Sequence, residues 1–122
     1  MVGPTLQQDL FSILLRFLTF QYVDTADIAR MYRQVQVDKS QTAFQTIFWR
    51  NNASEELAEF ELQTVTYGTA CASFLAIRAI VELANINASR YPTGLATIIN
   101  DFYVDDLLSG ANTEHEIKRI RN

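Results

Sequence analysis

The sequence predicts an α+β fold in which antiparallel strands are backed by helices on one face. Two observations predict it: helical and strand-like hydrophobic patterns succeed one another along the chain, and the composition is that of a folded protein. The 122 residues are 48% hydrophobic and include only 4 glycines and 2 prolines. A chain of this length is expected to form one domain with a buried core.

The first predicted elements are a helix and a strand. Apolar side chains recur at helical spacing over residues 6–20, where Thr5 and Gln8 match a capping box at the helix start. Residues 21–26 are short and β-branched, which predicts a strand. We expect this strand to present Asp27 at its C-terminal end.

The middle of the chain predicts short helical turns and a hairpin. Residues 28–35 and 40–44 each favour a turn or two of helix. Strand-like runs follow at 46–50 and 60–66, separated by the polar connector 51–59. These two runs are therefore predicted to pair as a hairpin with a long loop.

Gly68 interrupts the strand pattern, and the longest predicted helix follows at residues 69–85. Residues 90–94 are expected to form a turn. The run Thr-Ile-Ile-Asn-Asp-Phe-Tyr-Val at 97–104 is rich in β-branched and aromatic side chains, which predicts a strand.

The end of the chain predicts a tight hairpin and a charged helix. Asp105 and Asp106 connect the preceding run to a returning strand at 107–109. Thr113 then precedes a charged stretch, with Glu116 at the third helical position. This capping box predicts a terminal helix over residues 114–121.

Charge and composition exclude several classes of site and partner. The 10 basic and 14 acidic residues give a net charge of −4, whereas an isolated nucleic-acid-binding domain is normally basic. A single cysteine, Cys71, and a single histidine, His115, exclude an internal disulfide and multi-cysteine zinc modules. No apolar run reaches the length of a membrane span and no secretory signal is visible, so we expect an intracellular protein without a membrane partner.

The adjacent carboxylates Asp105 and Asp106 are the strongest candidates for chemistry. Aspartate is a common turn residue, so turn chemistry alone explains a pair of them at a hairpin. The apolar flanks leave a second interpretation open, because carboxylates held close together repel and a divalent cation would relieve that repulsion. Asp27 is the candidate third ligand, and three carboxylates form a hard-oxygen site suited to Mg²⁺.

A family resemblance bears on this choice. Tyr103-Val104-Asp105-Asp106, followed by Leu-Leu-Ser-Gly, resembles the catalytic hairpin of reverse transcriptases. The segments 2–10, 25–35 and 64–70 resemble, in order and spacing, the BEL/Pao class of LTR retrotransposon, the Pao retrotransposon polyprotein family. The resemblance spans essentially the whole chain.

The resemblance implies a right-handed polymerase palm with part of the fingers over residues 1–122, a fragment without thumb or RNase H. By it, Asp27 and Asp105 would bind two Mg²⁺ ions, with Mn²⁺ as the alternative metal, assisted by the backbone carbonyl of Ile28. Asp106 would complete the acidic cluster. Tyr103 and Val104 support the motif.

The resemblance also implies a nucleotide site. Tyr32 would stack beneath the incoming sugar and leave no room for a 2′-hydroxyl, which selects deoxynucleotides. Tyr67 and Gly68 would lie under the incoming nucleotide and the template base, where a missing side chain lets backbone approach a ligand. From the residues alone, a core tyrosine is the alternative interpretation of Tyr32.

The function implied is RNA-directed DNA polymerase: a primer 3′-hydroxyl attacks the α-phosphate of a deoxynucleoside triphosphate (dNTP). The implied partners are an RNA or DNA template with its primer, the dNTP and the remaining subdomains of a polyprotein. A cytoplasmic particle and the nucleus are both open as locations, and we expect the isolated fragment to be inactive. The alternatives are a non-catalytic retroelement remnant, a domesticated nucleic-acid-binding module with the same fold, and a plain α+β domain.

Overall fold

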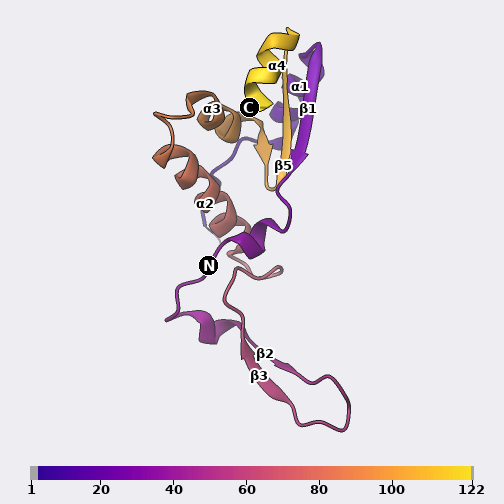
Figure 1. Cartoon of the computed structure of the whole chain (residues 1–122), viewed down its shortest axis with the longest axis vertical. Coiled ribbons are helices and arrows are strands. Elements are labelled where there is room, and N and C mark those ends of the chain that lie inside the picture. The colour runs from indigo at the N-terminus through magenta and orange to yellow at the C-terminus, as the bar shows by residue number, and fades with distance from the viewer. Residues whose placement is uncertain (1–2, 122) are drawn as a thin grey trace.

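The computed structural model describes residues 3–121 and confirms an α+β fold with antiparallel sheets. The molecule is elongated, with a long hairpin at one end and most of the helices with a small sheet at the other (Figure 1). The elements in chain order are α1 Leu10–Thr19, β1 Tyr22–Asp27, η1 Met31–Gln34, η2 Thr42–Gln45, β2 Thr46–Trp49, β3 Ala58–Glu61, α2 Ala72–Ile86, α3 Pro92–Asp101, β4 Phe102–Tyr103, β5 Asp106–Ala111 and α4 Glu114–Arg121.

The main sheet has the strand order β1-β5-β4, and both pairings are antiparallel. The β1–β5 register runs from Tyr22 opposite Ala111 to Asp27 opposite Asp106. Helices α1, α3 and α4 all pack against β5, which becomes fully buried from Ser109 onward. The strand predicted to deliver Asp27 is therefore confirmed, and its end lies beside the start of β5.

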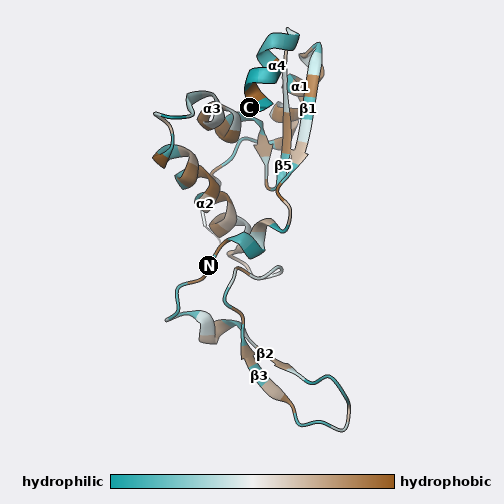
Figure 2. Cartoon of the chain, in the orientation of Figure 1, coloured by the Kyte–Doolittle hydropathy of each residue, from teal (hydrophilic) through white to brown (hydrophobic). Residues whose placement is uncertain are grey.

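The second sheet is the β2–β3 hairpin, whose predicted pairing is confirmed. The prediction of a strand over 60–66 is wrong beyond Glu61, because the chain leaves the ladder there and forms only an isolated bridge between Gln36 and Thr64. Apolar side chains such as Phe48 and Trp49 are exposed along the hairpin, which projects away from the rest of the protein (Figures 1 and 2).

A buried hydrophobic cluster lies where η1 meets the start of α2. Small side chains in α2 let η1 approach closely, and the tyrosine and methionine of η1 fill the space between them. The buried residues are Met31, Tyr32, Val65, Ala72 and Ala76. Partly buried neighbours that pack against them are Ile28, Val35, Val37, Ile77, Ile80 and Val104.

The first helix begins at Leu10, so the predicted start at residue 6 with Thr5 as cap is wrong. Asp9 is the N-cap, and its carboxylate accepts hydrogen bonds from the Ser12 backbone N–H at 3.0 Å and the Ser12 hydroxyl at 2.6 Å. A carboxylate is a strong N-cap because it satisfies free N–H groups of the first turn. Gln8, expected in the capping box, instead bonds to α3.

The strand predicted over 97–104 is also wrong, because most of that run is helix α3. Pro92 occupies the first turn, which makes the predicted turn at 90–94 the start of a helix. Leu95, Ile98 and Phe102 recur at helical spacing, and this periodicity prevails over the strand propensity of the β-branched residues. Only Phe102–Tyr103 is strand.

The two remaining helices follow the predictions closely. Helix α2 is the longest, and in α4 the Thr113 hydroxyl accepts from the Glu116 backbone N–H at 3.3 Å and bonds the Glu116 carboxylate at 2.9 Å. Helix α2 carries many hydrophobic residues whereas α4 is largely hydrophilic (Figure 2). Within residues 3–121, no helix has the length and apolar character needed to cross a membrane.

Candidate functional site: a carboxylate pair at the end of the sheet

Two aspartates from distant parts of the chain face each other where β1 ends and β5 begins. Asp27 lies directly opposite Asp106 in the antiparallel register, and the Ile28 N–H donates to the Asp105 carbonyl at 3.0 Å. That bond joins the residue after Asp27 to the residue before Asp106, which identifies Asp27–Asp106 as a non-hydrogen-bonded pair. In such pairs the Cα atoms approach to about 4.5 Å and the side chains are closest.

The third aspartate lies in the two-residue turn between β4 and β5. This turn consists of Val104 and Asp105, with Tyr103 paired to Asp106 across it. Val104 has a φ of 58°, in the left-handed region that β-branched residues rarely adopt. Strained backbone of this kind clusters at functional sites, where the surrounding structure maintains it.

The three aspartates have no cationic partner among the described residues, whose ion pairs all lie elsewhere. Asp105 is half-buried, whereas Asp27 and Asp106 are exposed. Arg30 and Arg33 follow β1 closely but are exposed and form no ion pair in this part of the chain. Like charges that face each other across strands destabilise the sheet unless a cation compensates them.

The donor atoms at this sheet end suit a hard cation, although they do not form a closed cage. Carboxylate and carbonyl oxygens are the ligands that Mg²⁺ prefers. The carbonyl of Ile28, predicted as a further ligand, accepts the Met31 N–H at 3.0 Å and has a second lone pair. Over residues 3–121 the structure contains no group of three or more acidic, histidine or cysteine side chains arranged to hold a metal ion.

The residues predicted for the nucleotide site lie near one another, because Tyr32 of η1 contacts Tyr67 and Gly68 follows Tyr67 in the chain. The Tyr32 side chain is buried, as in the core-tyrosine interpretation, and its hydroxyl lies 3.0 Å from that of Ser73. Its ring packs against Tyr67 with centroids 4.4 Å apart and planes inclined by 56°. Tyr67 is largely exposed, and Gly68 has a φ of 83° with open space where a side chain would lie.

Sequence reasoning missed the polar residues that support this sheet. Ser109 of β5 is fully buried and donates to the Asp101 carboxylate at 2.6 Å, while the Arg16 guanidinium pairs with the same carboxylate at 3.0 Å. Arg16 also donates to the Asn100 carbonyl. The network ties α1 and α3 to β5, and the signal available in the sequence was a charged residue inside each of two apolar runs.

The role of Gln7 was also missed, because the sequence analysis placed this residue only within the first predicted helix. Its side-chain carbonyl accepts the Val104 N–H at 3.1 Å, which joins the segment before α1 to the carboxylate-bearing turn. No local pattern signals this bond, because the two residues are 97 positions apart.

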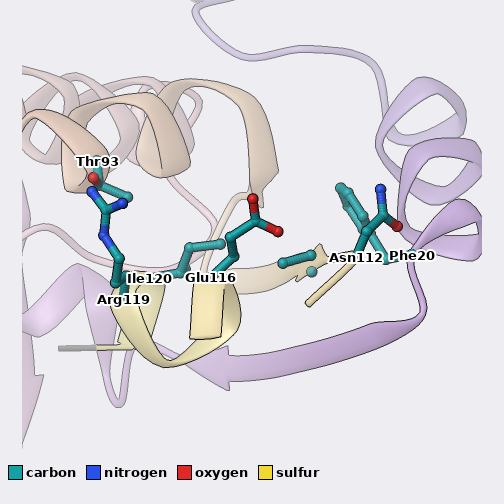
Figure 3. A pocket seen from close by; sticks show the side chains of 8 residues that line it. Phe20, Thr93, Asn112, Glu116, Arg119 and Ile120 are labelled. Atoms are coloured by element: carbon teal, nitrogen blue, oxygen red, sulfur yellow. The ribbon is translucent and has the colours of Figure 1, made fainter. Parts of the chain in front are cut away.

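A separate cleft of about 440 Å³ lies toward the opposite end of β5. Glu116 and Arg119 of α4 reach into it from one side, with Thr93 of α3 nearby and Phe20 across from them (Figure 3). Its β5 residues are Gly110 and Ala111, whereas the aspartates lie at the other end of that strand. The cleft is therefore distinct from the carboxylate pair.

Comparison with protein-family models and with curated proteins finds no match to this chain. A functional assignment therefore depends on the geometry of the β1–β5 end and on the sequence motifs that lie there. The most specific geometric feature is the alignment of Asp27 with Asp106 beside the turn that carries Asp105.

Proposed function

We propose that this chain is the palm, with part of the fingers, of an RNA-directed DNA polymerase that resembles those of BEL/Pao retrotransposons. The observation that carries the proposal is the cross-strand pairing of Asp27 with Asp106, next to the strained turn of Val104 and Asp105. Two segments far apart in the chain bring acidic side chains to the same end of the sheet. Among the described residues, these side chains form no ion pair with a basic residue. Such an arrangement favours binding of a divalent cation.

In the proposed reaction, Asp27 and Asp105 hold the metal ions, and Asp106 adds to the negative charge that attracts them. When bound, Mg²⁺ activates the primer 3′-hydroxyl and stabilises charge on the leaving oxygen. The aspartates position these groups from two different strands, one at the end of β1 and the other at the β4–β5 turn. Relative placement of the strands therefore controls the reacting geometry.

The two tyrosines, Tyr32 and Tyr67, form the proposed surface against which the incoming nucleotide packs. Tyr32 is held rigidly by burial and by its bond to Ser73, so its ring edge is a fixed steric limit beside the exposed Tyr67. We propose that this limit excludes a 2′-hydroxyl. Gly68, with open space around it, leaves room for the template base.

The projecting β2–β3 hairpin is the proposed finger segment. Its exposed aromatic residues, including Phe48 and Trp49, are suited to stacking or to packing against another subdomain. The net charge of −4 implies that most of the electrostatic grip on template and primer comes from other subdomains.

The test is primer extension by the protein translated from the longest open reading frame that contains these residues. We expect Mg²⁺-dependent synthesis on an RNA template, and its loss in Asp105→Asn with circular dichroism unchanged. Asp24→Asn is the matched control, because Asp24 lies in the same strand opposite Ser109 rather than opposite a carboxylate. Synthesis by Asp105→Asn at the parental rate would contradict the proposal.

A second candidate is a non-catalytic nucleic-acid-binding module with the same fold. It is favoured by the lack, among the described residues, of three metal-ligating side chains in a binding arrangement. Filter binding of a primer–template in EDTA distinguishes it. Tight metal-independent binding, together with no synthesis in Mg²⁺ or Mn²⁺, would favour this second function.

A further inference from the structure

The turn that carries Asp105 contains a residue poorly suited to its backbone conformation. Val104 has a φ of 58°, and Arg30 is the other non-glycine residue of the described chain with a positive φ. In two-residue hairpin turns, a left-handed first position is normally taken by glycine, asparagine or aspartate. A valine keeps this conformation only where its surroundings over-determine it.

One of these surroundings is Gln7. This half-buried side chain accepts the Val104 N–H through Oε1 at 3.1 Å. Gln7 lies in the irregular segment before α1, outside the sheet, so the bond is not part of any strand ladder. It anchors the turn to a part of the chain that the sheet itself does not position.

The Val104 side chain is held as well. It packs against the buried cluster and lines a very small internal space together with Leu6, Gln7 and Ile80. Val104, which is half-buried, therefore lines this space together with residues 6–7 and with residues of α2. The next residue, Asp105, is tied to β1, because its carbonyl accepts the Ile28 N–H at 3.0 Å.

We propose that Gln7 is a positioning residue for the carboxylate hairpin, and this inference rests on the polymerase function proposed above. Its amide oxygen maintains the left-handed conformation of Val104, and that conformation sets where the Asp105 carboxylate lies relative to Asp27. Gln7 acts through the backbone and does not itself contact metal, primer or nucleotide.

The first test separates the acceptor from the bulk of the side chain. Gln7→Met keeps the length and loses the acceptor, whereas Gln7→Glu keeps an oxygen that accepts the same N–H. In primer extension by the full open reading frame, we expect Gln7→Met to lower kcat about tenfold or more, since small displacements of a catalytic group have large kinetic effects. The KM for dNTP stays within about twofold, and Gln7→Glu retains most of the parental kcat.

Gln8→Ala is the matched control in the same segment. Its side chain donates to the Asn100 side chain at 2.8 Å and accepts from Arg16 at 3.2 Å, and neither bond involves the hairpin. We expect this variant to lower thermal stability while leaving kcat within about twofold. The positioning role is overturned if Gln7→Met lowers kcat no more than Gln8→Ala does. It is also overturned if Gln7→Glu lowers kcat as much as Gln7→Met does.

The second test does not depend on catalysis. Glycine adopts a positive φ without strain, so Val104→Gly removes the need for the anchor. We expect Gln7→Met to lower the urea midpoint of the full chain less in the Val104→Gly background than in the parent. Equal effects in both backgrounds, or a Gln7→Met chain that fails to fold in both, would overturn the proposal.

The two tests distinguish failure of the positioning role of Gln7 from failure of the polymerase function on which it rests. A parent protein that makes no DNA in Mg²⁺ or Mn²⁺ overturns the polymerase function and, with it, the catalytic consequence of Gln7. The urea experiment still decides whether Gln7 holds the Val104 conformation. An active parent with no thermodynamic coupling between the two residues leaves the polymerase function standing and overturns the role of Gln7.

Discussion

Asp27 and Asp106 lie directly opposite each other at the end of the β1–β5 ladder, and the backbone bond from Ile28 to Asp105 closes the sheet just beyond them. Two like charges therefore occupy the closest type of cross-strand pair, without a cationic partner in the described chain. Such a pair opposes folding in the absence of metal. The carboxylates that the proposed function requires therefore lower the stability of the metal-free protein.

This charge conflict predicts a stabilising mutation. In EDTA, Asp106→Asn should raise the free energy of unfolding by roughly 0.2–1 kcal/mol, because it removes one of two facing charges. Urea unfolding followed by circular dichroism measures the change. Added Mg²⁺ should raise the melting temperature of the parent, because bound metal stabilises the native state by mass action. The increase should be much smaller in Asp106→Asn.

The control for this prediction is Asp24→Asn, in which the substituted residue faces Ser109. It should change stability by less than about 0.5 kcal/mol, because the half-buried Asp24 forms no ion pair within residues 3–121. A loss of stability in Asp106→Asn without metal would show that the carboxylate has a favourable partner and would contradict the charge-conflict interpretation.

The polar network formed by Arg16, Asp101 and Ser109 predicts a large loss of stability in Asp101→Ala. That change removes the acceptor of the buried Ser109 hydroxyl and the partner of Arg16. Leaving such groups without a partner should lower the free energy of unfolding by about 1–3 kcal/mol. The comparison is Arg78→Ala, which breaks an exposed pair with Glu82 at 3.7 Å and should have an effect below about 0.5 kcal/mol. Equal losses in urea unfolding would contradict this ranking.

Two glycines should respond to alanine for different reasons. At Gly110 an added Cβ would lie 2.5 Å from a ring carbon of Phe20, so Gly110→Ala should lower stability by about 1–3 kcal/mol through overpacking. At Gly68 there is open space but a φ of 83°, so Gly68→Ala should lower stability by about 1–2 kcal/mol through backbone strain. Thermal unfolding measures both.

The two mechanisms are separated by shortening the neighbouring side chain. Measured against the Phe20→Ala single variant, part of the stability lost in Gly110→Ala should be recovered and none of that lost in Gly68→Ala, because Phe20→Ala removes Cγ and Cδ2, two of the three Phe20 atoms nearest the added Cβ. Recovery in both variants, or in neither, would show that the close approach at Gly110 is not the cause.

The cap of α1 predicts a pH dependence. Hydrogen bonds from the Ser12 side chain and then its backbone N–H lower the pKa of Asp9 below its ordinary value of 3.8. Because the folded pKa is the lower one, this contribution is present above about pH 3.8 and is lost as the pH falls through the folded value. Asp9→Asn should flatten the fall of the urea midpoint between pH 5 and pH 2. An unchanged pH profile in Asp9→Asn would contradict this origin.

Elements with a local signal could be predicted from the sequence. The Thr113–Glu116 capping box located α4, and the short β-branched run before Asp27 located β1. Predictions failed where two local signals competed. In α3 the strand propensity of the β-branched run opposed the helical spacing of its apolar residues, and at the start of α1 the cap is Asp9 and not the predicted Thr5.

The sequence by itself determined which residues are candidates for the site, because adjacent aspartates between apolar runs and an aspartate at a strand end are local features. Only the tertiary structure decided that Asp27 faces Asp106, that Gln7 holds Val104, and that Ser109 is buried on Asp101. Each of these relationships depends on strand register or on contacts between residues far apart in the chain. A one-residue shift in register would turn Asp27 to the other face of the sheet, and no local pattern encodes that register.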